Sequence, residues 1–154
     1  MTKIFIDGSQ GTTGLKIFDR LAKREDIELI TLPEDLRKDT NARKEALNSA
    51  DIAFLCLPDA AAIEAVSLID NDNTIVIDTS TAHRTNDGWA YGFPELSEEF
   101  ENKLKNSKRI AVPGCYASGF IALVKPLVDA GIVDSDTCIA CHALSGYSGA
   151  GKNG

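Results

Sequence analysis

Residues 4–14 of the chain read IFIDGSQGTTG, a short apolar run that ends on an acid and continues into three glycines spaced GxxGxxG. The apolar run predicts a buried strand, and Leu15, Phe18 and Leu21 then recur at helical spacing. Glycines between a strand and a helix permit a tight turn and a close approach of the backbone to a pyrophosphate, whose charge the helix N-terminus attracts. The stretch therefore predicts a dinucleotide-binding turn in preference to an ordinary glycine turn. The predicted contacts are Gly8, Ser9, Gly11, Thr12, Thr13 and Gly14.

The residues that follow continue the alternation of strand and helix. Apolar strands are expected over 27–32, 52–57 and 74–78, and helices over 40–49 and 60–69. Strands that are apolar on both faces and separated by helices indicate a parallel sheet covered on both sides. Right-handed crossovers then give an α/β, doubly wound, mostly parallel Rossmann-type sheet.

The pattern changes after Asp78. The expected elements are a charged helix over 97–106, a strand over 109–112, a long helix over 114–130, and a buried strand over 137–145. Pro126 should kink the long helix or start a new turn. We predict a dinucleotide-binding domain over 1–114 and the beginning of an α+β catalytic domain over 115–154. That second domain is expected to be truncated, because a domain seldom ends on a glycine-rich loop directly after a buried strand.

Composition argues against several function classes. The chain has 154 residues and a formal net charge of −7. Binding to a nucleic acid rests on clustered Lys and Arg, so no nucleic-acid partner is expected. No apolar run approaches the roughly 20 residues of a membrane helix, and the first residues do not resemble a signal peptide. We therefore expect a cytoplasmic protein with no membrane partner.

The four cysteines are Cys56, Cys115, Cys138 and Cys141, and in the cytosol they are expected to be thiols. Cys138-Ile139-Ala140-Cys141-His142 has the spacing of a c-type haem attachment site, which would require export. A zinc site is poorly supported, since there is one CxxC and the two histidines lie far apart. We instead expect Cys138, Cys141 and His142 to be core residues of the last strand, and no metal site.

The loop after the second strand carries both signals that distinguish NAD from NADP. An acid at the end of that strand binds the ribose hydroxyls of NAD, and Glu34 or Asp35 has that position. Arg37 and Lys38 follow at once and would instead hold a 2′-phosphate. We favour NADP, partly on the resemblance described below. A solvated charged loop is the alternative.

Cys115 lies in the segment VPGCYASG, residues 112–119, at the expected start of a helix. A helix N-terminus stabilises a thiolate by about 0.3–1 kcal/mol, a modest activation that a histidine would have to complete. The preceding glycine and the small residues that follow favour exposure over the usual burial of cysteine. Arg84 and Ser80 follow the fourth strand at the carboxyl edge of the sheet, where ligands bind. Arg84 is a candidate for a substrate carboxylate or phosphate, and Ser80 for the cofactor or substrate.

Five segments occur together and in order: the GxxGxxG turn, Leu57-Pro58, residues 91–96 (YGFPEL), residues 113–116 (PGCY) and residues 145–151 (SGYSGAG). This set resembles the shorter type of N-acetyl-gamma-glutamyl-phosphate reductase. The resemblance covers essentially the whole chain, but family members are roughly twice as long. It therefore implies that the chain is the N-terminal half of such an enzyme.

The resemblance implies reduction of N-acetyl-gamma-glutamyl phosphate by NADPH to N-acetylglutamate semialdehyde and phosphate, in arginine biosynthesis. Cys115 would be the nucleophile that forms a thioester, and Ser145 would lie at the substrate. Leu57, Pro58, Gly149, Ala150 and Gly151 would lie near the cofactor, although the last three also fit a plain turn. A homo-oligomer is implied for the full-length protein. The family's catalytic histidine has no counterpart here, so the half-chain should turn over poorly or not at all.

Two other readings of the residues remain open. Aspartate-semialdehyde dehydrogenase is the nearest enzymatic alternative, since it resembles this family in fold and thioester chemistry. A dinucleotide-binding module without catalysis is the alternative from another class, and it predicts that Cys115 is unreactive.

Overall fold

The computed structural model describes residues 1–134, 136–146 and 149. The chain divides into two compact units, Met1–Val112 and Pro113–Gly154.

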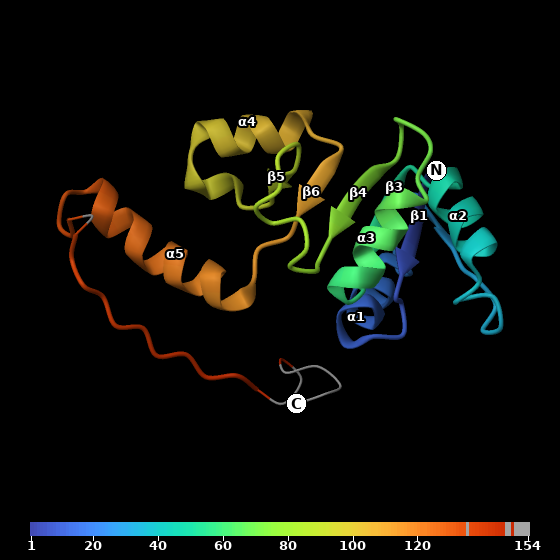
Figure 1. The fold of residues 1–154 in the computed structure, drawn as a ribbon, viewed down its shortest axis with the longest axis horizontal. Helices are drawn as coiled ribbons and strands as arrows, with labels where there is room; N and C mark the ends of the chain where they lie inside the picture. The colour runs from blue at the N-terminus through green and yellow to red at the C-terminus, as the bar shows by residue number, and fades with distance from the viewer. Residues whose placement is uncertain (135, 147–148, 150–154) are drawn as a thin grey trace. The chain divides into compact units, whose positions relative to one another are not determined.

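The first unit is built on a parallel sheet of six strands with the order β2-β1-β3-β4-β6-β5 (Figure 1). The strands are β1 (Thr2–Asp7), β2 (Ile27–Ile30), β3 (Ile52–Leu55), β4 (Ile75–Asp78), β5 (Ala90–Tyr91) and β6 (Arg109–Ala111). The prediction of a doubly wound parallel sheet is confirmed. β5 was not predicted, because a strand of two residues is too short to show a hydrophobic period.

Four α-helices and one short 3₁₀-helix connect these strands. They are α1 (Thr12–Leu21), α2 (Thr40–Ser49), α3 (Asp59–Ser67), η1 (Pro94–Leu96) and α4 (Glu98–Asn106). Side chains cap two of them: Asp39 accepts a hydrogen bond from the Ala42 N–H, and Ser97 accepts one from the Phe100 N–H. These caps satisfy backbone donors that a helix start leaves free, which explains why α2 and α4 begin where they do.

The core of the first unit lies where α2 and α3 pack on the sheet. It contains Phe5, Ala53, Leu55 and Val76 from the strands. The helices contribute Ala46, Leu47, Ala62 and Ala65, and all eight residues are buried. Alanine on α2 and α3 lets the helix backbones approach the sheet closely, so these helices pack tightly on the strands.

The second unit consists of α5 (Cys115–Asp129) and an extended segment that follows it. The helix continues through Pro126, which lies in its last turn. Residues 137–145 form no strand, so this prediction was wrong. A strand needs a hydrogen-bonded neighbour, and none is present among the described residues of this unit.

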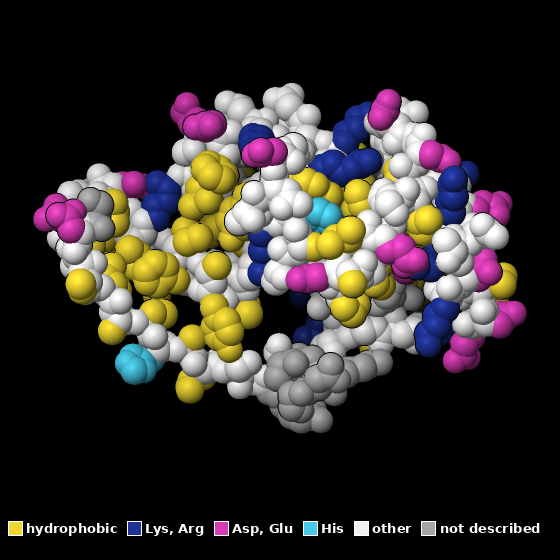
Figure 2. All heavy atoms as spheres, viewed as in Figure 1, with side chains coloured by type: hydrophobic (Ala, Val, Ile, Leu, Met, Phe, Trp, Pro, Cys, Tyr) yellow, Lys and Arg dark blue, Asp and Glu magenta, His cyan; other side chains and the backbone are white. Residues whose placement is uncertain are grey.

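The burial predicted for this segment was wrong as well. Cys138, Cys141 and His142 are all exposed, because nothing in the described part of the unit covers them. Large apolar side chains of α5 are exposed too, including Tyr116, Leu123 and Leu127. Figure 2 shows hydrophobic side chains gathered over this part of the chain.

Candidate functional site

The first unit has its topological switch point between β1 and β3. The chain leaves β1 for β2 on one side of it and returns to β3 on the other. In open α/β sheets ligands bind outside the carboxyl ends of strands at such a point. The loops that follow β1 and β3 therefore form the first part of the candidate site.

Two of the three glycines of the first loop, Gly8 and Gly14, occupy positions where a side chain would collide with backbone. Gly8 has φ +84°, and a Cβ atom there would lie 2.3 Å from the carbonyl oxygen of Cys56. A Cβ atom on Gly14 would lie 2.3 Å from the carbonyl oxygen of Gly8. Gly11 donates its N–H to that same Gly8 oxygen and is the N-cap of α1. These contacts make the turn as tight as a dinucleotide loop requires.

The start of α1 is suited to hold a pyrophosphate. No side chain caps it, and its first two residues, Thr12 and Thr13, are exposed. The first N–H groups of a helix have no intrahelical acceptor and carry partial positive charge. Ser9 is half-buried in the turn beside them. The residues present therefore fit the pyrophosphate of a dinucleotide.

The loop after β3 packs directly on this turn. The Leu57 Cδ2 atom would lie 3.2 Å from a Cβ atom on Gly8, and Pro58 is the N-cap of α3. Cys56 is half-buried here, and burial raises the pKa of its thiol to about 11. Its thiol is therefore a poor nucleophile at neutral pH.

The loop between β2 and α2 contains the charged residues predicted to select the nucleotide. It is a series of turns, with N–H groups of Leu36 and Asp39 bonded to the carbonyls of Pro33 and Leu36. Arg37 is half-buried, whereas Lys38, Glu34 and Asp35 are exposed. The structure thus keeps both the acids and the bases of this loop accessible to a ligand.

The loop after β4 is organised by a buried carboxylate. Asp78 accepts hydrogen bonds from the Ser80 N–H at 2.9 Å and from the Ser80 hydroxyl at 2.7 Å. Its Oδ2 atom also lies 2.7 Å from Nδ1 of His83, whose ring stacks on Trp89 with centroids 4.1 Å apart. The Ser80 hydroxyl proton is thus already donated within the protein.

Arg84 is held by backbone carbonyls. Its Nε donates to the carbonyl oxygen of Val112 at 3.0 Å, and Nη2 lies 3.4 Å from the carbonyl oxygen of Thr79.

Asp59, the first residue of α3, accepts hydrogen bonds from the N–H and the hydroxyl of Thr81. These two bonds from Thr81 lower the pKa of Asp59. The loops after β3 and β4 are therefore joined at the carboxyl edge of the sheet.

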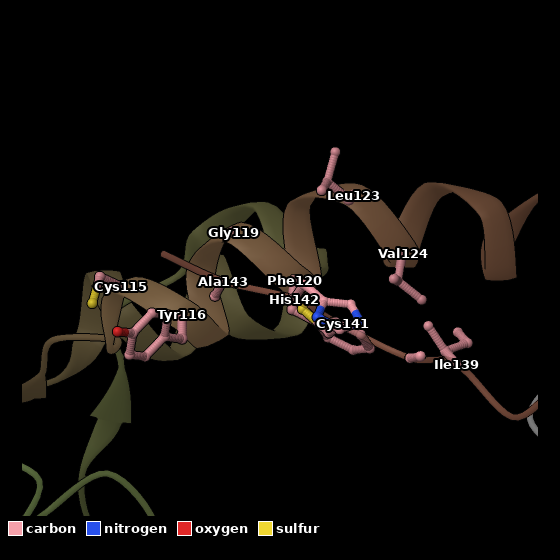
Figure 3. A pocket seen from close by; sticks show the side chains of 11 residues that line it. Cys115, Tyr116, Gly119, Phe120, Leu123, Val124, Ile139, Cys141, His142 and Ala143 are labelled. Atoms are coloured by element: carbon pink, nitrogen blue, oxygen red, sulfur yellow. The ribbon is translucent and has the colours of Figure 1, made fainter. Parts of the chain in front are cut away.

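In the second unit, Cys115 is exposed and is the first residue of α5. The N-cap, Gly114, has no side chain that could compete for the first N–H groups of the helix. Cys115 lies at one end of a groove of about 410 Å³. The groove runs along α5, and residues 139–143 line its other side. In Figure 3, Cys115 and Tyr116 lie at one end of the row and Ile139 lies at the other.

The remaining residues predicted to contact ligands lie near the end of the described chain. Ser145 is exposed, and a Cβ atom on Gly149 would lie 3.2 Å from its Oγ atom. Ala150 and Gly151 lie outside the described residues. Of these four predicted residues, the structure therefore describes Ser145 and Gly149.

No group of three or more His, Cys, Asp or Glu side chains in the described ranges is arranged to hold a metal ion. Among the same residues, no helix has the length and apolar character needed to cross a bilayer.

Two family models match parts of the chain. Residues 32–104 match the family described as semialdehyde dehydrogenase, NAD binding domain. Residues 115–154 match the semialdehyde dehydrogenase dimerisation domain. Together with the Rossmann-type sheet, these matches show that the chain is similar to semialdehyde dehydrogenases, including their NAD-binding domain.

Curated relatives identify the family more closely. The chain is 55% identical over 98% of its length to N-acetyl-gamma-glutamyl-phosphate reductase of Chelativorans sp. (strain BNC1). It is 56% identical over 97% of its length to N-acetyl-gamma-glutamyl-phosphate reductase 2 of Pseudomonas putida. The chain is a homologue of the N-acetyl-gamma-glutamyl-phosphate reductases, as the motifs predicted. It spans about half the length of these relatives, 49% and 48% respectively.

Solved structures of aspartate-semialdehyde dehydrogenases share the fold. The enzyme of Francisella tularensis superposes with a TM-score of 0.63 at 16% identity, covering 85% of this chain and 42% of that one. The enzyme of Candida albicans, solved with NADP, gives 0.61 at 19% identity, covering 84% of this chain and 47% of that one. At such low identity, the likeness concerns the fold alone.

The sequence did not predict two polar clusters beside the candidate site. One is Asp78 with His83, and the other is Arg43 with Asp7 and Glu64. A signal for the second existed, because Arg43 precedes Ala46 and Leu47 by three and four residues and so shares their buried helix face.

Proposed function

We propose that the full-length protein reduces N-acetyl-gamma-glutamyl phosphate to N-acetylglutamate 5-semialdehyde and phosphate with NADPH, a step of arginine biosynthesis. The observation that carries the proposal is the exposed Cys115 at the uncapped start of α5. It occurs in a chain more than half identical to reductases of that name.

The proposed chemistry begins at the sulfur of Cys115. The thiolate attacks the acyl carbon, the bond from that carbon to the phosphate oxygen breaks, and phosphate leaves behind a thioester. The hydride that reduces the thioester carbonyl would come from a bound nicotinamide cofactor. The resulting thiohemiacetal gives the aldehyde when its C–S bond breaks and returns the electron pair to Cys115.

The first unit is proposed as the dinucleotide-binding domain. Gly8, Ser9, Gly11, Thr12, Thr13 and Gly14 would hold the pyrophosphate, beside Leu57 and Pro58. The tight contacts at Gly8 and Gly14 and the open start of α1 support this assignment. Arg37 and Lys38 would hold the 2′-phosphate of NADP, because they lie in the loop after β2 where that phosphate is bound.

The remaining assignments rest on position and on the motif match. Arg84 would bind the substrate carboxylate or phosphate, and Ser145 would contact the substrate. Ser80, Gly149, Ala150 and Gly151 would lie near the cofactor. Ser80 would not donate its hydroxyl proton to the cofactor, because that hydroxyl already donates to Asp78.

The second unit is proposed as the beginning of the catalytic domain, and the full-length protein as a cytoplasmic homo-oligomer. The dimerisation-domain match and the exposed apolar side chains of α5 support an assembly. The 154-residue chain alone is proposed to have little or no activity, because it carries no counterpart of the family's catalytic histidine.

The test compares two acyl phosphates in a full-length protein that carries this chain, with NADPH oxidation as the readout. We expect turnover with N-acetyl-gamma-glutamyl phosphate, little with β-aspartyl phosphate, and loss of activity in Cys115→Ser. Preference for β-aspartyl phosphate would make the protein an aspartate-semialdehyde dehydrogenase. No turnover with either would favour a binding module.

A further inference from the structure

An ion cluster of the first unit, formed by the buried pair Arg43 and Asp7 with Glu64, has no part in the chemistry above. Arg43, in the first turn of α2, donates its Nε to Oδ2 of Asp7 at 3.1 Å and its Nη1 to Oε2 of Glu64 at 3.0 Å. Its Nη2 lies 3.0 Å from the same Asp7 oxygen. The side chains of Arg43 and Asp7 are 9% and 6% exposed, so this pair lies beneath the surface and out of a ligand's reach.

The three partners belong to three different parts of the dinucleotide site. Asp7 is the last residue of β1 and is followed at once by Gly8. Arg43 lies four residues after Asp39, the N-cap where the loop carrying Arg37 and Lys38 ends. Glu64 belongs to α3, whose N-cap is Pro58. One guanidinium therefore joins the elements that support all three loops around the switch point.

Burial raises the pKa of Asp7, because the cost of removing its charge from water outweighs the attraction of Arg43. A pair of this kind adds little stability compared with apolar side chains of the same volume. Ala46 and Leu47 already anchor α2 one turn further along the same face. The cluster is thus better explained by fixing the position of the first turn than by stabilising the helix.

We propose that Arg43 is a positioning residue of the dinucleotide site, which it braces through Asp7 and Glu64 without touching the ligand. This inference rests on the proposed cofactor site. It makes a specific prediction, because a positioning residue affects the binding of the whole nucleotide, whereas a ligand contact affects the binding of one of its groups. Loss of Arg43 should weaken NADP⁺ and NAD⁺ by the same factor, whereas loss of Arg37 or Lys38 should weaken NADP⁺ alone.

The experiment titrates NADP⁺ and NAD⁺ into the 154-residue chain by calorimetry. Arg43→Gln should weaken both nucleotides about tenfold, as expected if the competent arrangement of the loops falls to about a tenth of the population. Arg43→Lys should recover part of the loss. The matched control is Thr74→Val, which removes a buried hydrogen bond to the Ala50 carbonyl at the opposite end of the sheet. It should lower the melting temperature without weakening either nucleotide.

Amide hydrogen exchange of residues 8–14 and 34–39 gives a second readout that needs no ligand. Faster exchange in both loops of Arg43→Gln, and not of Thr74→Val, supports the brace even if the unsubstituted chain binds no nucleotide and the cofactor proposal fails. Unchanged affinity and exchange in Arg43→Gln would overturn the inference and leave the cofactor site standing. If Arg43→Gln does not fold, Glu64→Ala decides, since its side chain is 51% exposed. It should loosen the same loops, and unchanged exchange there would equally overturn the inference.

Discussion

The carbonyl oxygen of Cys56 lies 2.3 Å from the position that a Cβ atom on Gly8 would occupy. This contact joins the loops that follow β1 and β3, the two strands at the switch point of the sheet. Because carbonyl oxygens cannot move without moving the strand end, residue 8 must be glycine for both loops to keep their places.

Gly8→Ala should lower the free energy of unfolding by about 3–5 kcal/mol, since backbone strain at positive φ adds to the collision with Cys56. Gly88→Ala is the matched control, because Gly88 has φ +81° and no atom within 4 Å of its would-be Cβ. That control should cost only about 1–2 kcal/mol. Urea denaturation of both variants gives the comparison. Equal costs would contradict the tight contact between the two loops.

Cys56 should resist alkylation while the other three thiols react. Its pKa is raised by burial from 9.0 to about 11, so at pH 8 its thiolate fraction is about a hundredfold lower. Cys115, Cys138 and Cys141 are exposed. Intact-mass analysis after brief iodoacetamide treatment should therefore show three adducts, and a fourth only in urea. Rapid addition of four adducts to the folded chain would show that the loop after β3 is open.

The same thiol makes stability depend on alkaline pH. An acid whose pKa is raised on folding holds its proton more tightly in the folded state, so its contribution is complete below pH 9 and is lost as pH rises towards 11. Cys56→Ala should flatten the fall in the free energy of unfolding between pH 9 and 11. If the free energy of unfolding of Cys56→Ala falls as steeply as that of the unsubstituted chain, groups other than Cys56 cause the fall.

His83→Phe should destabilise the first unit by about 1.5–3 kcal/mol, because the fully buried Asp78 carboxylate loses a hydrogen bond. The phenyl ring can still stack on Trp89, the only tryptophan of the chain. His83→Ala should cost more and should also shift the fluorescence of Trp89. Equal costs for the two variants would contradict this expectation and would mean that the bond to Asp78, and not the ring contact, is what matters.

Arg37→Ala and Lys38→Ala should each weaken NADP⁺ by roughly tenfold, the loss of one charge-assisted contact, and leave NAD⁺ unchanged. The measurement is calorimetric titration of the 154-residue chain with both nucleotides. Tighter binding of NAD⁺ than NADP⁺ by the unsubstituted chain would instead assign the loop's role to Glu34 or Asp35.

Most of the first unit could be predicted because its signals are local. Apolar runs that end on Asp7, Leu57 and Asp78 predict strands that are apolar on both faces, and the helix over 40–49 lies where its weak apolar period predicts it. β5 is too short to carry such a signal.

The second unit could not be predicted in the same way. The apolar run around Ile139 indicates a strand, but a strand forms only where a partner strand lies beside it. No pattern within residues 137–145 tells whether that partner is present. The contacts of Arg43 and His83 were missed for a related reason, since a single polar residue does not reveal its partner in the sequence. The motif around Cys115 could be found because its residues are contiguous.

The most direct test of the proposed reaction is a single turnover without nucleotide. The full-length protein that carries this chain is mixed with N-acetyl-gamma-glutamyl phosphate, and phosphate release and intact mass are followed together. We predict one equivalent of phosphate and one N-acetylglutamyl group on Cys115, released as aldehyde when NADPH is added, and neither in Cys115→Ser. An acyl group on another residue, or phosphate release that persists in Cys115→Ser, would contradict the account.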